Sequence, residues 1–108
     1  MERFAANYVY LPEYGFLKQY VVERAGDNIR LFPLVNEIEA VSWVSGIICL
    51  VALEKEKKDV LRKSFFSNKQ VLPGVPNGIT LNNIQVIQLS PFDFTCMQTL
   101  DNTQLTVY

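Results

Sequence analysis

The longest apolar run of the chain is Val41-Ser-Trp-Val-Ser-Gly-Ile-Ile-Cys-Leu-Val-Ala-Leu53, which also holds the single tryptophan. Several of its residues are β-branched, and acidic residues flank it at Glu39 and Glu54. A run of this length suits a strand covered on both faces, and it is far shorter than the roughly 20 apolar residues that span a membrane. Gly46 interrupts the run, which indicates a bulge or the close approach of another backbone. We therefore expect the core to be built around residues 41–53.

The composition is that of one globular domain. The chain has 108 residues, 49% of them hydrophobic and 19% charged, with a net charge of −1. This length is enough to bury a core, and the small net charge gives no general attraction to nucleic acid or to an anionic membrane. Because the first residues lack the basic and apolar pattern of a signal peptide, we expect a cytoplasmic protein.

Outside the central run, short β-rich segments alternate with turns. We expect strands at residues 3–11, 16–24, 29–32, 84–89, 92–100 and 105–108, with turns at 12–15, 25–28 and 101–102. Residues 54–63 are strongly polar and predict either an exposed helical turn or, as we favour, the tip of a β-ribbon leading into a strand at 60–66. Residues 67–83 contain Pro73-Gly74, Pro76 and Asn77-Gly78 and predict a long loop. The sequence thus predicts a single all-β domain that can include one short helix, folded as an antiparallel sandwich or a small barrel.

The residues that usually carry metal or redox chemistry are scarce. The chain has no histidine and only two cysteines, Cys49 and Cys96, whose separation matches no zinc-binding spacing. Nothing in the sequence indicates the oxidising compartment or the proximity that a disulfide requires. We expect two free thiols, no metal and no cofactor.

Charge is distributed unevenly, and this pattern directs the main functional hypothesis. Every lysine and arginine lies at or before Lys69, and residues 70–108 carry only Asp93 and Asp101. Strands so poor in charge invite edge pairing unless they are covered. We therefore predict a non-catalytic structural or protein-interaction module that self-associates or binds a protein partner by burying strand surface or by adding a strand. The predicted interface residues are Ile84, Val86, Gln88 and Tyr108.

Two other functions compete with this hypothesis. The first is a small-ligand binder or enzyme that uses the carboxylates of Glu37, Glu39 and Asp93 in the mouth of a barrel. A serine triad is excluded because it needs histidine, and residues 74–78 lack the Lys-Ser/Thr of a phosphate-binding loop. A binding loop of another kind is the remaining functional interpretation of that segment.

The second competitor is single-stranded nucleic-acid binding through residues 57–69. Five basic residues of this segment surround two aromatic ones, an arrangement that can follow a phosphate backbone and stack on bases. The basic residues are Lys57, Lys58, Arg62, Lys63 and Lys69, and the aromatic ones are Phe65 and Phe66. Because Glu54, Glu56 and Asp59 cancel part of this charge, a solvated polar segment is the favoured interpretation.

One partial resemblance covers less than half of the chain. Gly26-Asp-Asn-Ile-Arg-Leu-Phe-Pro-Leu34, followed by Trp43-Val-Ser-Gly46-Ile-Ile48, resembles the composite β domain of amidohydrolase-type metal-dependent hydrolases. In that family a His-x-His metal motif follows the glycine, whereas Gly46 here is followed by Ile-Ile-Cys-Leu-Val. The resemblance therefore implies a free-standing scaffold module without a hydrolytic site, and no metal ligand carries over.

Overall fold

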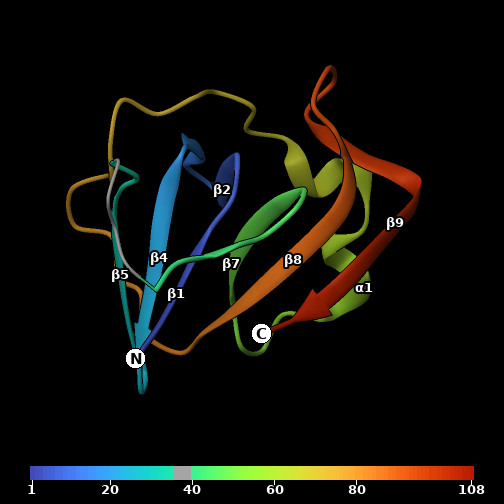
Figure 1. Cartoon of the computed structure of the whole chain (residues 1–108). Coiled ribbons are helices and arrows are strands. Elements are labelled where there is room, and N and C mark those ends of the chain that lie inside the picture. The colour runs from blue at the N-terminus through green and yellow to red at the C-terminus, as the bar shows by residue number, and fades with distance from the viewer. Residues whose placement is uncertain (36–39) are drawn as a thin grey trace.

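Two β-sheets, packed face to face, make up most of the computed structural model, which describes residues 1–35 and 40–108 (Figure 1). The strands are β1 (Glu2–Ala5), β2 (Tyr8–Leu11), β3 (Gly15–Lys18), β4 (Tyr20–Ala25), β5 (Asn28–Pro33), β6 (Ser42–Trp43), β7 (Ile47–Ala52), β8 (Ile84–Asp93) and β9 (Gln98–Val107). The small sheet has the strand order β5-β4-β1-β6, and the large sheet has the order β3-β2-β7-β8-β9. The predicted all-β class and sandwich are confirmed, and the strands of the described residues do not close into a barrel. The sheets are mixed rather than purely antiparallel, because β6 runs parallel to β1 and β7 runs parallel to β2.

Three extended runs of chain each pass from one sheet into the other. They join β1 to β2, β3 to β4, and β6 to β7. Backbone hydrogen bonds fix the bends: the Gln19 N–H donates to the Asn7 carbonyl at 2.9 Å, and the Val44 N–H donates to the Ala5 carbonyl at 2.7 Å. Gln19 takes a positive φ of 55° at its bend. The segments predicted as single strands at 3–11, 16–24 and 41–53 are therefore each divided between the two sheets.

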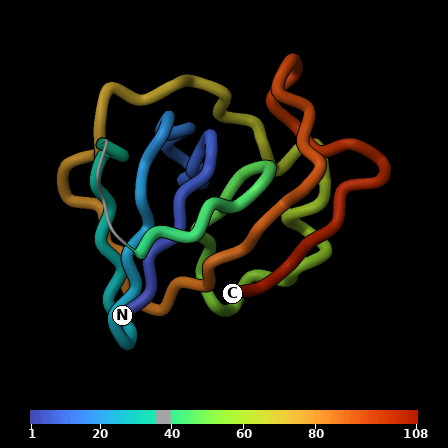
Figure 2. Tube along the Cα trace, viewed as in Figure 1, coloured from blue at the N-terminus to red at the C-terminus, as the bar shows by residue number. Residues whose placement is uncertain are grey.

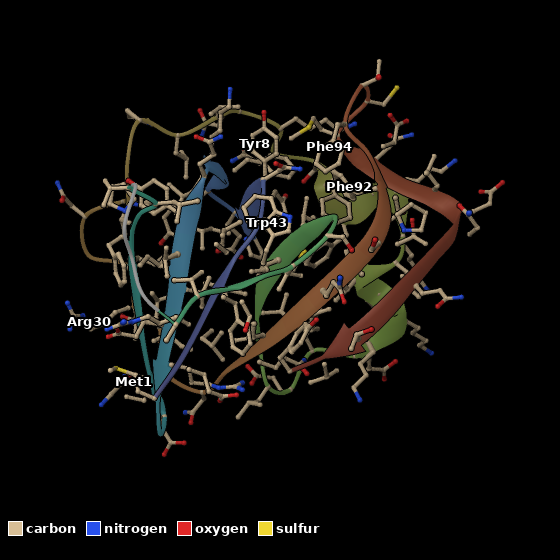
Figure 3. The ribbon with its side chains drawn as sticks, viewed as in Figure 1. Met1, Tyr8, Arg30, Trp43, Phe92 and Phe94 are labelled. Atoms are coloured by element: carbon tan, nitrogen blue, oxygen red, sulfur yellow. The ribbon has the colours of Figure 1, made fainter. Side chains whose placement is uncertain are left out.

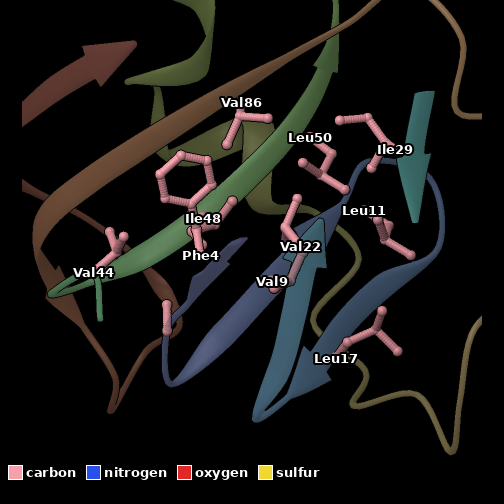
Figure 4. Close-up of a cluster of buried hydrophobic side chains, with 11 residues drawn as sticks. Phe4, Val9, Leu11, Leu17, Val22, Ile29, Val44, Ile48, Leu50 and Val86 are labelled. Carbon is pink, nitrogen blue, oxygen red and sulfur yellow. The ribbon is translucent and has the colours of Figure 1, made fainter. Parts of the chain in front are cut away.

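Aliphatic side chains from both sheets form the core between them (Figure 4). The central apolar run contributes to it as predicted: Ile48 and Leu50 face this interior, while Ile47, Cys49 and Val51 face the opposite side of the large sheet, and all five are buried. The buried members of the inner core are Phe4, Ala6, Val9, Leu11, Leu17, Val22, Ile29, Val44, Ile48, Leu50 and Val86.

The outer face of the large sheet is aromatic and is covered by two short helices, α1 (Lys57–Val60) and the 3₁₀ helix η1 (Lys63–Phe66). Phe66 is fully buried there, with its ring centroid 4.9 Å from that of Tyr10 and 5.3 Å from that of Phe92. The helical alternative for residues 54–63 is thus correct, and the ribbon tip with a strand at 60–66 is wrong. A helical segment places both Val60 and Phe66 on the sheet, where they cover the aromatic face.

Gly46 and Trp43 lie in the same apolar run but have opposite surroundings. At Gly46, φ is 77° and an added Cβ would lie 2.1 Å from the carbonyl oxygen of Leu89, which confirms the predicted close approach of another backbone. Trp43, in contrast, is 56% exposed. It belongs to the short outermost strand β6, and the tryptophan is therefore not part of the core.

The last 25 residues of the chain, 84–108, form one long hairpin of β8 and β9, which turns at residues 94–97. The predicted turn at residues 101–102 is wrong. These residues lie within β9, where the pairing with β8 shifts register between Ser90 and Phe92. The Thr103 hydroxyl holds this irregularity, because it accepts a hydrogen bond from the Leu100 N–H at 2.8 Å and donates one to the Pro91 carbonyl at 2.7 Å.

Candidate functional site: the free edge of strand β9

The residues predicted to form an interface lie on one face of two neighbouring strands. Ile84, Val86 and Gln88 alternate along β8, and Tyr108, just after β9, donates its backbone N–H to the Val86 carbonyl at 2.9 Å. The structure therefore brings all four together. Val86 is fully buried and offers no surface to a partner, whereas Ile84 is half-buried and packs against the same inner core. Gln88 and Tyr108 do reach the surface.

A chain of polar contacts fixes the end of β9 to the body of the protein. The Tyr108 hydroxyl donates to Gln88 Oε1 at 3.1 Å, and Gln88 Nε2 donates to the Ser45 carbonyl at 2.9 Å. The ring centroids of Tyr108 and Phe4 lie 5.0 Å apart, and the backbone oxygen of Tyr108 accepts a hydrogen bond from Arg24 Nη1 at 2.7 Å. These contacts order the strand end, so pairing with another strand costs β9 little additional conformational entropy.

The ladder between β8 and β9 shows which backbone groups of β9 are free. In an antiparallel pair, residues alternate between hydrogen-bonding to the partner strand and pointing away from it. The Tyr108 N–H bonds to β8. By the same alternation, the backbone N–H and C=O groups of Thr106 and Gln104 point towards β8, and those of Leu105 and Val107 point away from it. Within the described ranges, β8 is the only strand paired with β9. The N–H and C=O groups of Leu105 and Val107 therefore form an open edge.

The side chains along this edge do nothing to block pairing. Natural edge strands are commonly protected by charged residues, proline or short length. Residues 102–108 contain no charge and no proline, and threonine, valine and tyrosine favour strands. Val107 and Tyr108 are 41% and 40% exposed. We call residues 102–108 the open edge.

The other three sheet edges are protected. At β3, the Phe16 N–H donates to the Gln70 carbonyl at 2.9 Å and the Leu72 N–H donates to the Phe16 carbonyl at 2.7 Å, so the passing loop covers this edge. The β5 edge carries Arg30, whose side chain extends outward (Figure 3), and it ends at Pro33, which has no N–H. β6 has only two residues.

The proposed carboxylate site is not assembled by the described residues. Glu37 and Glu39 lie outside them. The Asp93 carboxylate accepts hydrogen bonds from the backbone N–H groups of Thr95 at 2.9 Å and Cys96 at 3.1 Å. These bonds, that from Cys96 above all, lower the pKa of Asp93 below its usual 3.8. Asp93 therefore holds the 94–97 turn as an ionised cap.

In the 57–69 segment, the aromatic side chains face the protein. Phe66 is buried, and Phe65 packs on Tyr10 with ring centroids 5.7 Å apart. Several basic residues lie beside acids: Lys58 is 3.2 Å from Glu56, and Lys63 is 3.7 Å from Asp101. The stacking platform that single-stranded nucleic acid needs is thus used as the cover of the sheet.

The loop of residues 73–83 borders two open grooves. One, of about 370 Å³, is lined mainly by apolar groups that include Leu11, Leu50 and Ile84. The other, of about 530 Å³, lies along Pro73, Gly74 and Pro76. Among the described residues, Glu13 is the only carboxylate that lines either groove, so these residues form no cluster of acids there. Elsewhere, both cysteines are free thiols, and burial raises the pKa of Cys49.

Comparison of the chain with protein-family models, with curated proteins and with solved structures finds no match. The resemblance to the amidohydrolase composite domain therefore stays a prediction. None of the helices in the described part of the chain has the length and hydrophobicity to cross a lipid bilayer.

Sequence reasoning found this region through its lack of charge but could not identify the open edge. The free backbone groups of Leu105 and Val107 depend on where β9 lies in the sheet and on its register with β8. The side chains of Leu105 and Val107 share a face with the aromatic cluster, whereas Gln104, Thr106 and Tyr108 share the face of Gln88. Strong β-propensity in a charge-free C-terminal segment was the available signal.

Proposed function

We propose that this protein is a self-associating interaction module, and that one copy binds another by strand addition at the open edge. The observation that carries this proposal is the row of backbone groups at Leu105 and Val107 that no described residue pairs with, within the charge-free residues 102–108. The contrast with β3, β5 and β6, each protected, supports it. Main-chain hydrogen bonds would supply the affinity, and burial of the exposed part of Val107 would add to it.

The expected association is weak and depends on concentration. A net gain of about 0.5–1.5 kcal/mol is typical of each intramolecular hydrogen bond, and two proteins also lose translational and rotational freedom when they bind. Pairing of the open edge alone gives a contact at the small end of protein interfaces. We therefore expect reversible association in the micromolar range rather than a permanent dimer.

Sedimentation velocity over a series of protein concentrations tests the proposal. The wild-type protein should shift from monomer towards dimer as concentration rises. Thr106→Lys should remain monomeric, because Thr106 is exposed and makes no side-chain hydrogen bond within the described residues, while a lysine there places like charges on both copies.

Thr80→Lys is the matched control. Thr80 is also exposed, and it lies in the 73–83 loop on the side of the molecule opposite β9 (Figure 2). The Thr80→Lys variant makes the same charge change as Thr106→Lys and should associate like the wild type. A wild-type protein that stays monomeric throughout, or two variants that associate equally, would contradict the proposal.

A further inference from the structure

Asn77 and Gly78 form an exposed turn in the loop of residues 73–83. Gly78 has a φ of 77°, and an added Cβ there would meet nothing within 4 Å, so the turn is open to solvent. We propose that Asn77 is a site of spontaneous covalent modification, at which the asparagine is converted to aspartate or isoaspartate by reaction with its own backbone and with water.

The reaction needs only these two residues and water. When the Gly78 N–H has lost its proton to base in the solvent, the nitrogen attacks Cγ of Asn77. A new C–N bond forms, and Nδ2 of Asn77 takes up a proton and leaves as ammonia. The product is a cyclic succinimide. Water then adds to one of its two carbonyl groups and breaks the adjoining ring C–N bond, which gives aspartate or isoaspartate. An amide nitrogen is thus exchanged for an oxygen, and nothing is oxidised or reduced.

The structure does not hinder the closure of this ring. Closure requires a rotation of the backbone at Asn77 that brings the Gly78 nitrogen to the side-chain Cγ. No described residue hydrogen-bonds to the Asn77 carboxamide or to the peptide group that joins it to Gly78, so the rotation breaks no such bond. Glycine also has no side chain to obstruct the attack, and its backbone is the most permissive of all residues.

The other asparagines of the chain are less suited to the reaction. Each of them precedes a residue with a side chain, whereas Asn77 precedes a glycine. Asn82 and Asn83 are exposed in the same loop, but they precede Asn83 and Ile84. The Asn83 carbonyl also accepts a hydrogen bond from the Leu53 N–H at 2.9 Å, which restrains its backbone. Modification should therefore begin at Asn77.

The modification changes the groove of about 530 Å³ that this loop borders. Asn77 and Glu13 both line it, and Glu13 is the only carboxylate among its described lining residues. Either product therefore adds a second carboxylate to the same groove. Isoaspartate also adds a methylene to the main chain between Val75 and Ile79, which pack against the inner core on the two sides of the turn. The loop of the isoaspartate form thus differs from the native loop in both charge and path.

Incubation of the folded protein in warm, mildly alkaline buffer tests the proposal. An acidic species should accumulate on anion-exchange chromatography, because each event adds a negative charge to a chain whose net charge is −1. Peptide mapping by mass spectrometry should place aspartate and isoaspartate at position 77, with Asn77→Asp as the standard for the first product. The rate should rise with pH, because the attacking nitrogen must lose its proton.

Asn77→Gln and Asn82→Gln form a matched pair of variants. Glutamine at position 77 would have to close a larger ring, so Asn77→Gln should lose the acidic species. Asn82 is exposed in the same loop, and Asn82→Gln should form the acidic species as fast as the wild type. An acidic species that persists in Asn77→Gln, or that disappears in Asn82→Gln, would overturn the assignment to Asn77.

The same incubation in urea separates the contribution of the fold from that of the sequence. The folded protein and the unfolded chain should both be modified first at position 77. Modification that occurs in urea and is absent from the folded protein would show that the fold protects Asn77, and it would overturn the inference. A folded protein whose first modified asparagine lies elsewhere in the peptide map would do the same.

Discussion

The two edge strands of the large sheet, β3 and β9, differ in whether another segment of the chain covers them. At β3, a passing loop supplies two backbone hydrogen bonds to Phe16, and Gly15 lets the loop come close. At β9, no described residue outside β8 pairs with the strand, and residues 102–108 carry no charge to deter a partner. The comparison shows that covering an edge needs only a short segment in the right place. An edge without even this cover, and without charge, is suited to binding another strand.

The largest predicted effect comes from disrupting the covered edge. Gly15 has a φ of 138°, and an added Cβ would lie 2.5 Å from the Gln70 carbonyl oxygen. Gly15→Ala should therefore displace the loop and lower the free energy of unfolding by about 2–4 kcal/mol, as measured by urea denaturation.

Gly26→Ala is the control for this substitution. Gly26 also has a positive φ, of 60°, but an added Cβ would meet nothing within 4 Å. It should cost only the backbone strain, about 1–2 kcal/mol. Equal losses for the two variants would show that the close contact between Gly15 and Gln70 does not matter.

A smaller effect is predicted at the irregular part of β9. Thr103→Val keeps the shape of the side chain but removes the hydrogen bonds with Leu100 and Pro91. We expect a loss of about 1–2 kcal/mol in the free energy of unfolding. Thr106→Val, at an exposed residue on the same strand, should change stability little. If both variants were as stable as the wild type, the Thr103 hydroxyl would not fix the path of β9.

The smallest effect concerns the turn that leads into β9. Hydrogen bonds from Cys96 and Thr95 lower the pKa of Asp93 in the folded protein, so between the folded and unfolded pKa values the folded state binds fewer protons. The stabilisation is therefore complete above the ordinary value of 3.8 and is lost as pH falls through the lowered one. NMR titration should place the Asp93 pKa below 3.8, and Asp93→Asn should flatten the acid side of the stability curve. A pKa at or above the ordinary value would contradict this role for the carboxylate.

The sequence predicted the β class, the buried central run and the long loop, but not the division of strands between sheets. Periodicity shows that residues 3–11 and 16–24 are extended, and it cannot show that they bend. The bends depend on hydrogen bonds between distant residues, such as Gln19 with Asn7, and Gln19 takes a positive φ that favours glycine. Local sequence signals were therefore insufficient to locate the bends between the two sheets.

The C-terminal hairpin was misplaced for a related reason. The turn at residues 94–97 has neither glycine nor proline, and the Asp93 side chain stabilises it instead. Asp101-Asn102, which has turn chemistry, is accommodated inside β9 next to Thr103. Low charge directed the interface prediction to β8 and β9, and the open edge belongs to the second of these strands. Burial of Val86 could be known only once β8 was seen to be an interior strand of the large sheet.

The three runs that bend from one sheet into the other have a consequence for how the protein comes apart. Neither sheet can detach as a unit, since peeling it away would pull on β1–β2, β3–β4 and β6–β7 at once. Denaturation should therefore proceed as a single all-or-none event, with tryptophan fluorescence reporting on Trp43 in the small sheet and far-UV circular dichroism following the same curve. On the proposed function, a fold that unfolds only as a whole would let β9 pair with a second copy while the other strands stay in place.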